Sequence, residues 1–389
     1  MESHSLRTID GDAALRDARR LSFARFPGTE EEARARRIIS DGLRHLGYSV
    51  EEHSFRYDSF PADLLRRLSP LLPVALIGGF ALLLPRVSIL EWLALTVGLP
   101  MALLLLRRPW LERLFDGDRE ASANLLARRP CGNAGTARPV ILFVAHVDSK
   151  SQALSLVLRS LLATTLLISS AVGWLLIGLD ATAFRIGAPF SLVAICLVLA
   201  GCGLPLALNR NGNDSPGALD DAAGCGVLME LARVVKDAPD LPYEPVFAFT
   251  GAEEVGMVGA ARLARQLGGE KTEAWRFVNF DGPGAGCGLL ALTHGPAGRK
   301  VASAARSASS DCGVPIRFAR LIPAAGVDGV PLGARGLSGV TLLSASTGPA
   351  VRAVHRPGDR WENLEPRALE AAGRLALALA HRLSDESFS

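Results

Sequence analysis

Histidine and carboxylate side chains follow directly after three apolar runs of the sequence. The runs and the groups behind them are VILFVA (140–145) before His146 and Asp148, PVFAFT (245–250) before Glu253 and Glu254, and FVNF (277–280) before Asp281. Each run has the length and composition of a buried strand. Because open α/β sheets place their sites beyond the carboxyl ends of the strands, we expect these side chains to converge.

Two further segments carry groups of the same kind in loops. Asp220 and Asp221 lie in the Pro/Gly turn PGALDDAAG (216–224), and His355 lies in VHRPGDRWENL (354–364). Histidine and carboxylate are common zinc ligands, and a zinc site can keep an open position for water. Two ions bridged by one carboxylate would form a two-metal hydrolytic site. The spacing is not a local signature such as H-E-x-x-H, so the residues alone indicate a metal site without fixing their individual roles.

Other charged groups near these segments have interpretations that need no metal. We interpret Asp221 as a residue of a helix N-terminus that complements the helix dipole. His294, in LTHGP, is interpreted as a loop residue. Two roles stay open: Asp359 is a candidate for orienting His355, and Asp328 is a candidate for shaping a substrate pocket.

The elements that must position these groups alternate between strand and helix. Apolar residues recur at helical spacing in 31–48 and 256–267, and a third helix is predicted over 221–237. Besides the three runs above, strands are predicted at 48–55 (YSVEEHSF) and 123–129 (ANLLARR). This alternation predicts an α/β fold with a mostly parallel central sheet and helices on both faces.

The apolar residues of the chain are concentrated in two regions. The 389 residues are 49% hydrophobic, and the excess lies in 68–106 and 153–208. These regions contain four segments near the ~20 residues that a helix needs to span a bilayer, with Glu91 as their one charge. The segments are 68–85, 87–106, 160–179 and 186–209. We therefore predict about four transmembrane helices in two hairpins, the first with a tight loop at Pro85-Arg86.

The two hairpins would interrupt one catalytic domain. Its parts are predicted at 1–67, at 108–152 (with the strand and the first metal ligand) and at 210–389 (with the rest of the metal site), and the hairpins at 68–107 and 153–209. Without the hairpins roughly 290 residues remain, which is enough for one domain with a full core.

Positive charges flank the hairpins on the sides joined to the rest of the protein. Those sides carry Arg66, Arg67, Arg107, Arg108, Arg113, Lys150, Arg159 and Arg210. The two tips carry only Arg86 and Arg185. The positive-inside rule then predicts an integral protein of the plasma or inner membrane, with its catalytic domain in the cytoplasm.

Cysteine usage and charge narrow the compartment and the partners. Six cysteines without a C-x-x-C pair favour a reducing compartment, and the N-terminal MESHSLRTID lacks the apolar region of a signal peptide. A net charge of +3, with no basic run interleaved with aromatic residues, argues against nucleic acid as a partner. The expected partners are a peptide substrate and the lipid bilayer.

Taken together, five motifs in the same order resemble the M28 zinc aminopeptidases. They are AHVDS, GALDDAAG, GAEEVGMVGA, NFDGPG and VHRPGDRWENL. The N-terminal FPGTEEEARARRIISDGLRHLGYSV is similar to the first helix and strand of that family. The resemblance covers the chain except the two hydrophobic hairpins, which the usual soluble members lack. It implies a zinc-exopeptidase-like fold that binds two zinc ions.

Carried over residue by residue, the resemblance implies a role for each group. One zinc ion would be held by His146 and Asp281 and the second by Glu254 and His355, with Asp220 bridging both. Glu253 matches the general base, which takes a proton from the zinc-activated water and passes it to the leaving amine. Asp148 matches a carboxylate that orients His146 from behind.

Three functions are compatible with these features. The leading interpretation is a membrane-anchored aminopeptidase that removes N-terminal residues from peptides through a di-zinc-activated water. The alternatives are a glutaminyl-cyclase-like acyltransferase with a single zinc ion and a non-catalytic receptor or scaffold on the same fold. Retention of both His146 and Asp281, together with Glu253, favours two ions and hydrolysis.

The second hairpin leaves the chain close to one metal-site segment and returns close to another. Asp148 and Arg159 are eleven residues apart, which is at most about 40 Å of extended chain, and the return to Asp220 is similarly short. The metal-site face should therefore lie close to the bilayer. We hypothesise that the hairpins hold the mouth of the site at the membrane and favour hydrophobic or membrane-associated peptides. The alternative is that they serve only as an anchor.

Overall fold

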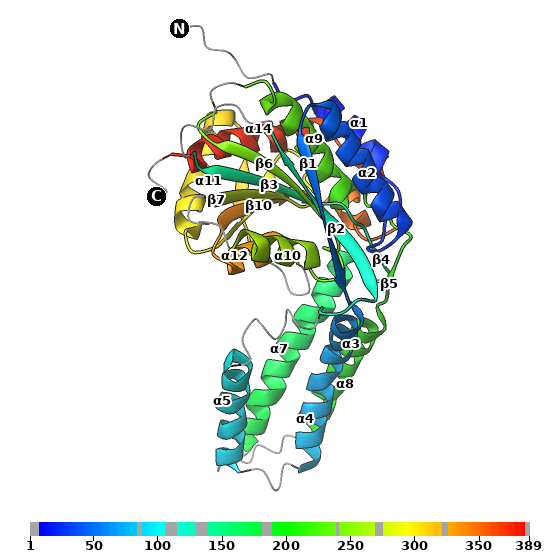
Figure 1. Cartoon of the computed structure of the whole chain (residues 1–389). Helices are drawn as coiled ribbons and strands as arrows, with labels where there is room; N and C mark the ends of the chain where they lie inside the picture. Colours follow the sequence, from blue (N-terminus) through cyan, green and yellow to red (C-terminus); the bar gives the residue numbers. More distant parts are fainter. Residues whose placement is uncertain are drawn as a thin grey trace.

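A mixed sheet of eight strands forms the centre of the computed structural model (Figure 1), in the order β1-β2-β6-β3-β7-β10-β8-β9. The structure describes residues 8–83, 88–105, 115–129, 138–180, 189–238, 241–268, 275–320 and 326–385. The strands are β1 (Ser49–Tyr57), β2 (Glu120–Arg128), β3 (Val140–His146), β6 (Glu244–Thr250), β7 (Trp275–Phe280), β8 (Leu289–His294), β9 (Ile316–Phe318) and β10 (Ser338–Ser344).

The central strands of this sheet are parallel and the outer ones are mostly antiparallel. β6, β3, β7 and β10 pair in parallel, and so do β8 and β9. β1 pairs with β2, β2 with β6, and β10 with β8 in antiparallel fashion. The predicted mostly parallel sheet is therefore correct for the centre, whereas the complete sheet is mixed. β1 keeps exposed residues along its length, and antiparallel strands tolerate such partial exposure better than parallel ones.

Helices cover both faces of the sheet, as predicted (Figure 1). One face packs against α1 (Gly11–Leu21), α2 (Glu30–His45), α9 (Ala223–Val235), α11 (Gly298–Cys312) and α14 (Pro366–Leu383). The other packs against α10 (Val258–Leu267) and α12 (Gly329–Ala334). Successive residues of β3 alternate between the two cores, because neighbouring side chains of a strand point to opposite faces. This double burial explains the continuous apolar run that ends at His146.

Four apolar helices project away from the sheet (Figure 1). They are α4 (Leu72–Leu83), α5 (Ile89–Leu105), α7 (Leu156–Asp180) and α8 (Pro189–Leu208). Among the described residues, two stretches are long and apolar enough to cross a membrane, Leu156–Leu179 and Ser191–Leu208. α4 has 12 residues and α5 has 17, fewer than the ~20 of a full span. Two candidate spans are thus observed rather than the predicted four. The predicted hairpin tips at Arg86 and Arg185 lie outside the described residues.

The surface of these helices differs from that of the α/β domain. In the described part of the chain, all exposed large apolar side chains except Phe318 and Val330 lie between residues 60 and 208. The helices also pack against one another through a separate apolar cluster that includes Ile77, Leu166 and Leu199. Soluble proteins rarely leave such a large contiguous apolar surface uncovered.

A narrow neck joins the α7–α8 hairpin to the α/β domain. α7 and α8 are inserted between β4 (Ser151–Gln152) and β5 (Asn211–Gly212), which pair with each other in antiparallel fashion. Beside this neck lies α3 (Phe60–Leu68), which leads through a short 3-10 turn (Ser69–Leu71) into α4. Arg67 on α3 donates a hydrogen bond to the carbonyl oxygen of Ala207 on α8 at 3.3 Å. Both helical segments therefore leave the domain at the same place.

Candidate metal centre

The predicted site residues converge at the carboxyl ends of three adjacent strands. β6, β3 and β7 are neighbours in the sheet, and His146 at the end of β3 pairs with Thr250 at the end of β6. Glu253 and Glu254 follow β6, and Asp281 follows β7. Since parallel strands end at one edge of the sheet, the three segments meet there.

Asp220 and His355 reach this edge from loops. Asp220 lies in the turn over Ala218–Ala222 that precedes α9, and its peptide bond to Asp221 is cis. His355 follows α13 (Pro349–Ala353) with φ +62°, and Ala252, just before Glu253, has φ +55°. Positive φ is unfavourable for residues other than glycine. Local backbone strain is therefore stored in the loop that presents His355 and in the loop that presents Glu253.

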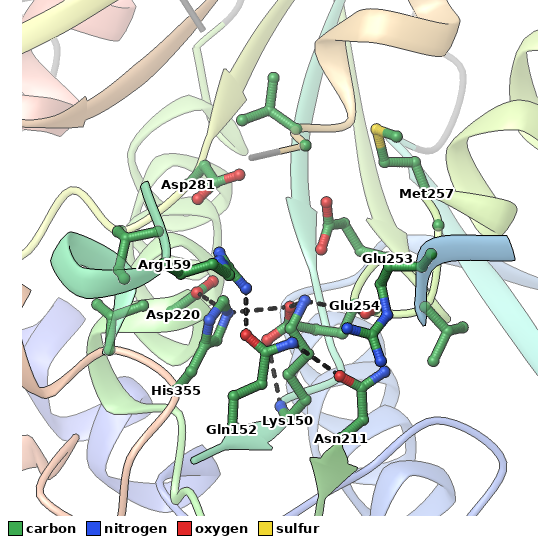
Figure 2. A pocket seen from close by; sticks show the side chains of 18 of the residues that line it. Lys150, Gln152, Arg159, Asn211, Asp220, Glu253, Glu254, Met257, Asp281 and His355 are labelled. Carbon is green, nitrogen blue, oxygen red and sulfur yellow. Dashed lines mark hydrogen bonds and ion pairs between the residues drawn. The ribbon is translucent and has the colours of Figure 1, made fainter. Parts of the chain in front are cut away.

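The converging side chains form two groups that could each hold a metal ion (Figure 2). One group is His146, Asp220 and Asp281, and the other is Asp220, Glu254 and His355; the ligand atoms of each group lie within 4.8 Å of one another. The two oxygens of Asp220 face different partners. Oδ1 lies 2.9 Å from Nε2 of His146, and Oδ2 lies 3.0 Å from Nε2 of His355. Asp220 is thus common to both groups.

The charges of these groups suit divalent cations. Burial would raise the pKa of Asp220, but hydrogen bonds from His146 and His355 hold it well below its usual value. The pKa of Asp281 is raised well above its usual value by burial and by the negative charge of Asp220. The cluster therefore contains more buried negative charge than its own cations neutralise. Histidine nitrogens with carboxylate oxygens are also the donor set that zinc takes in hydrolytic sites, so the residues fit zinc.

Glu253 lies beside these groups without belonging to either. Its side chain is buried and lines the cavity, and it is not a member of the two ligand groups. Burial raises the pKa of its carboxyl well above the usual value, helped by the negative charge of Glu254 and opposed by His146. A carboxylate with a raised pKa next to a candidate metal centre is suited to accept a proton.

Asp148 makes contacts to both site segments. Its carboxylate accepts hydrogen bonds from the backbone N–H groups of Glu253 at 3.1 Å and Glu254 at 2.9 Å. Nδ1 of His146 lies 3.1 Å from the carbonyl oxygen of Asp148 and 3.8 Å from its carboxylate. The nearest acceptor behind the histidine ring is therefore the Asp148 carbonyl, and the carboxylate fixes the loop that carries the two glutamates.

Asp221 forms hydrogen bonds to three segments near the site: the end of β3, the start of α9 and the loop after β7. Its carboxylate accepts hydrogen bonds from the N–H groups of Gly224 and Gly282, both at 3.0 Å, and of His146 at 3.3 Å. Gly224 lies in the first turn of α9, so Asp221 accepts a hydrogen bond at the start of this helix, and its complementing of the helix dipole stays a prediction. Burial raises the pKa of Asp221 to about 8.

The structure shows the contacts of three residues whose interpretation was open or was a loop. Asp359 accepts hydrogen bonds from the N–H groups of Leu219 at 2.7 Å and Asp220 at 3.3 Å, so it positions the Asp220 turn instead of the ring of His355. Asp328 is buried and accepts a hydrogen bond from the hydroxyl of Thr250, and its neighbour Val327 lines the cavity, so a role in shaping the pocket stays a prediction. His294 is the last residue of β8 rather than a loop residue.

Arg25 is a positioning residue that the sequence analysis missed. Its buried guanidinium donates to the carbonyl oxygens of Val147, of Pro216 at 2.6 Å and of Gly217 at 2.8 Å. It thereby links the loop after β3 to the turn that carries Asp220. Each of these contacts joins residues more than a hundred positions apart in the sequence, and no periodic pattern or motif predicts them.

A cavity of about 1050 Å³ opens above the metal centre and extends to the apolar helices. Its floor includes Asp220, Glu253, Glu254, Asp281 and His355. Its lining also includes Phe60, Arg66 and Arg67 from α3 and Leu156, Val157 and Arg159 from the start of α7. The edge of the sheet that carries the candidate metal centre therefore points toward the neck of the helical projection. This agrees with the short sequence connections between the site residues and the second hairpin.

Two cations of this cavity lie close to the acidic cluster (Figure 2). Lys150 pairs with Glu254 at 2.7 Å. With His355, this lysine lowers the pKa of Glu254 to about 2, against the opposing effect of burial. The second cation is the buried Arg159, which comes from the first turn of α7.

Solved structures with this fold include hydrolases and a cyclase. A zinc aminopeptidase from Bacillus subtilis aligns with a TM-score of 0.58 over 99% of this chain and 97% of that chain, at 16% identity. A glutaminyl cyclase from an Acidobacteriales bacterium also has a TM-score of 0.58, covering 99% and 98% of the two chains at 14% identity. At these identities the likeness shows the fold alone.

Sequence comparisons identify relatives among metallopeptidases. Endoplasmic reticulum metallopeptidase 1 of Rattus norvegicus is 33% identical over 105 residues, which cover 25% of this chain and 10% of that protein. Aminopeptidase YwaD of Bacillus subtilis (strain 168) is 28% identical over 175 residues, which cover 43% of this chain and 38% of that protein. The matched segments thus span less than half the length of these relatives.

The family comparison covers more of the chain. Residues 124–380 match peptidase family M28. This segment contains the second half of β2, all the candidate metal ligands and Glu253, and it also contains the α7–α8 hairpin. The match extends over more than half of the protein, and the fold is that of a zinc aminopeptidase. The chain belongs to peptidase family M28.

Proposed function

We propose that this protein is a membrane-anchored zinc aminopeptidase that hydrolyses N-terminal residues of peptides with Glu253 as general base. One observation carries the proposal: two ligand groups share Asp220 at the floor of a cavity, beside a buried carboxylate that belongs to neither. Membership of family M28 and the metallopeptidase relatives support it.

The ligands divide into two sets that meet at one residue. His146 and Asp281 would hold one zinc ion, Glu254 and His355 the second, and Asp220 both. When bound, the ions supply a Lewis acid that lowers the pKa of a water towards ~7. Asp148 keeps Glu254 and Glu253 in place through their N–H groups, because ligand carboxylates need a fixed backbone to hold a metal well.

Glu253 moves the proton in this proposal. Its carboxylate accepts a proton from the attacking water and gives it to the amine of the departing peptide. Both transfers require a carboxylate that is close to the metals and free of them. Its burial and position on the cavity wall meet this requirement.

A glutaminyl cyclase is the alternative enzymatic function, since that activity occurs on the same fold. The second ligand group favours hydrolysis, because a reaction with a single zinc ion does not need both His146 and Asp281 in addition to Glu254 and His355. A scaffold without activity would have no need of Glu253. Metal content separates the three functions at about two, one or no zinc ions per chain.

Membrane anchoring is supported by the apolar surface of the projecting helices. α7 and α8 contain the two candidate spans, and their outward-facing side chains are apolar. The side chains of Arg66 and Arg67 at the neck lie at the boundary that basic residues favour on the cytoplasmic side of a membrane. We therefore place the catalytic domain in the cytoplasm.

The substrate in this proposal is a hydrophobic or membrane-associated peptide. Part of the cavity lining comes from α3 and α7, the segments that enter the projection. Phe60, Leu64 and Leu68 of α3 are exposed apolar residues next to basic ones. Amphipathic helices of this kind bind at a bilayer surface. Binding of α3 there would place the mouth of the cavity next to the lipid.

Replacing Glu253 with Gln should abolish proton transfer and leave metal binding intact. We expect turnover of an aminoacyl amide to fall by about 10²- to 10⁴-fold, with unchanged zinc content by metal analysis. Glu31→Gln, on the exposed face of α2, is the matched control and should keep normal turnover. Near-normal hydrolysis by the Glu253 variant would show that another group is the base.

Replacing single ligands should distinguish the bridging role of Asp220 from the role of Asp281. Asp220→Ala should lose most of both zinc ions, since one carboxylate serves both groups. Asp281→Ala should retain close to one zinc ion, because the second ligand group (Asp220, Glu254 and His355) keeps all its members. Metal analysis of the purified variants, with folding checked by circular dichroism, measures both. Equal losses in the two variants would contradict the bridge.

The orientation can be read from a native cysteine. Cys287 is exposed in the catalytic domain. A membrane-impermeant maleimide should therefore label it in inverted vesicles and leave it unlabelled in sealed right-side-out vesicles. Cys287→Ala should lower the labelling in inverted vesicles. Labelling of Cys287 in right-side-out vesicles would place the catalytic domain outside.

Shortening the second hairpin should separate substrate presentation from anchoring. A short Gly/Ser linker in place of residues 164–204 keeps the start of α7, including Arg159. We expect a selective loss of activity on a lipophilic peptide in vesicles, with a soluble dipeptide amide still hydrolysed and two zinc ions still bound. Equal rates on both substrates would leave the hairpin as an anchor only.

A further inference from the structure

Arg159 is an unusual residue for the first turn of an apolar helix. α7 begins at Leu156, and the next charged residue of this helix is Asp180 at its end. The neighbouring Val157 and Leu158 are exposed at 64% and 42%, whereas Arg159 is exposed at only 7%. The arginine therefore points inward, away from the apolar surface, and it lines the cavity above the metal centre.

The side chain of Arg159 lies beside Asp220 and His355 in the cavity (Figure 2). One of its terminal nitrogens, Nη1, donates to the side-chain oxygen of Gln152. The amide group of Gln152 donates in turn to Asn211 at 2.8 Å, across the β4–β5 neck. The backbone N–H of Gln152 donates to the carbonyl of His355 at 2.8 Å. The guanidinium is thus fixed relative to the metal centre.

Among the described residues no carboxylate pairs directly with Arg159, although the negative charges of Glu254, Asp220 and Glu253 act on its guanidinium from nearby. Within the described part of the chain it forms no ion pair at 4.0 Å or less, and its buried Nε has no hydrogen-bond partner. The nearby carboxylates have other partners: Asp220 faces both histidines, and Glu254 faces Lys150 and His355. A buried guanidinium without a directly paired counter-charge is costly, and an anion that enters the cavity would stabilise it.

The chemistry of the group selects the anion. Guanidinium donors lie in one plane and match the two oxygens of a carboxylate. When zinc binds, Asp220, Glu254 and Asp281 are engaged by the metals, and their negative charge no longer compensates Arg159. A substrate carboxylate would then be the counter-charge nearest to the reaction centre.

We infer that Arg159 binds the free C-terminal carboxylate of the substrate, so that the preferred substrates are short peptides, dipeptides above all. This inference rests on the proposed peptidase function. Because Arg159 lies beside Asp220 and His355, a carboxylate bound to it belongs to a residue about one or two positions beyond the scissile bond, at ~3.5 Å per residue. Arg159 is a specificity-determining residue carried by the apolar hairpin.

A pair of substrates that differ only at the C-terminus tests the inference. The zinc-loaded full chain in detergent is assayed with an apolar dipeptide and with the same dipeptide as its C-terminal amide. Wild type should prefer the free acid. Arg159→Met, which keeps the length of the stem, should lower kcat/KM for the free acid by roughly 10- to 100-fold, mainly through KM, and leave the amide nearly unchanged. Arg159→Lys should lie between the two.

Controls separate recognition from a structural role and from lipid contact. Arg66→Met removes a cation of the same cavity whose guanidinium is paired with Asp63 at 2.6 Å, and it should leave the acid-to-amide ratio unchanged. Calorimetry of dipeptide binding in the Glu253→Gln background measures recognition without turnover. Adding Arg159→Met should weaken binding of the free acid and not of the amide.

Three results would overturn the inference. They are an equal loss on acid and amide in Arg159→Met, an unchanged acid-to-amide ratio in that variant, and an Arg159 effect that appears only with anionic vesicles and is absent with neutral ones, which would indicate a lipid headgroup. If wild type hydrolyses neither substrate, the proposed peptidase function fails. The calorimetric comparison still decides whether Arg159 recognises a carboxylate.

Discussion

One carboxylate, Asp220, faces two histidines that come from distant parts of the chain, and the surrounding structure holds it there. Asp359 binds the N–H groups on one side of its turn, and Arg25 binds the carbonyl groups on the other. β3 supplies His146, and the loop after α13 supplies His355. In the proposed two-zinc site Asp220 would serve both ions, so a small shift of this turn would affect both, and the buried contacts that converge on the turn would limit such shifts.

The same constraint separates what the sequence could predict about the site from what it could not. His146, Glu253 and Asp281 each follow a continuous apolar strand, so their convergence follows from the geometry of a parallel sheet. The contacts of Arg25 and the actual partners of Asp359 depend on loops more than a hundred residues apart. Such pairings leave no periodic trace, and only the folded chain reveals them.

The fold was predictable where periodicity was strong. The helices at α2, α9 and α10 and the strands β1, β2, β3, β6 and β7 lie within a few residues of their predicted positions. After Asp281 the sequence analysis predicted roles for loop residues only, so α11, α14 and the strands β8 to β10 were not predicted. One of these strands, β9, has only three residues. Hydropathy also predicted four spans, whereas two stretches of the described residues are long and apolar enough to cross a membrane.

The position of the hairpin in the chain has a consequence for biosynthesis. β3 is made before α7 and α8, whereas both of its neighbours in the sheet, β6 and β7, are made after them. Domains fold as the chain emerges from the ribosome. β3 therefore stays unpaired until the hairpin and then β6 and β7 have been synthesised, and the centre of the sheet forms only after that. In a membrane-inserted protein, the ribosome would deliver the hairpin to the bilayer first, and the catalytic domain would close afterwards on a chain already tethered at its neck.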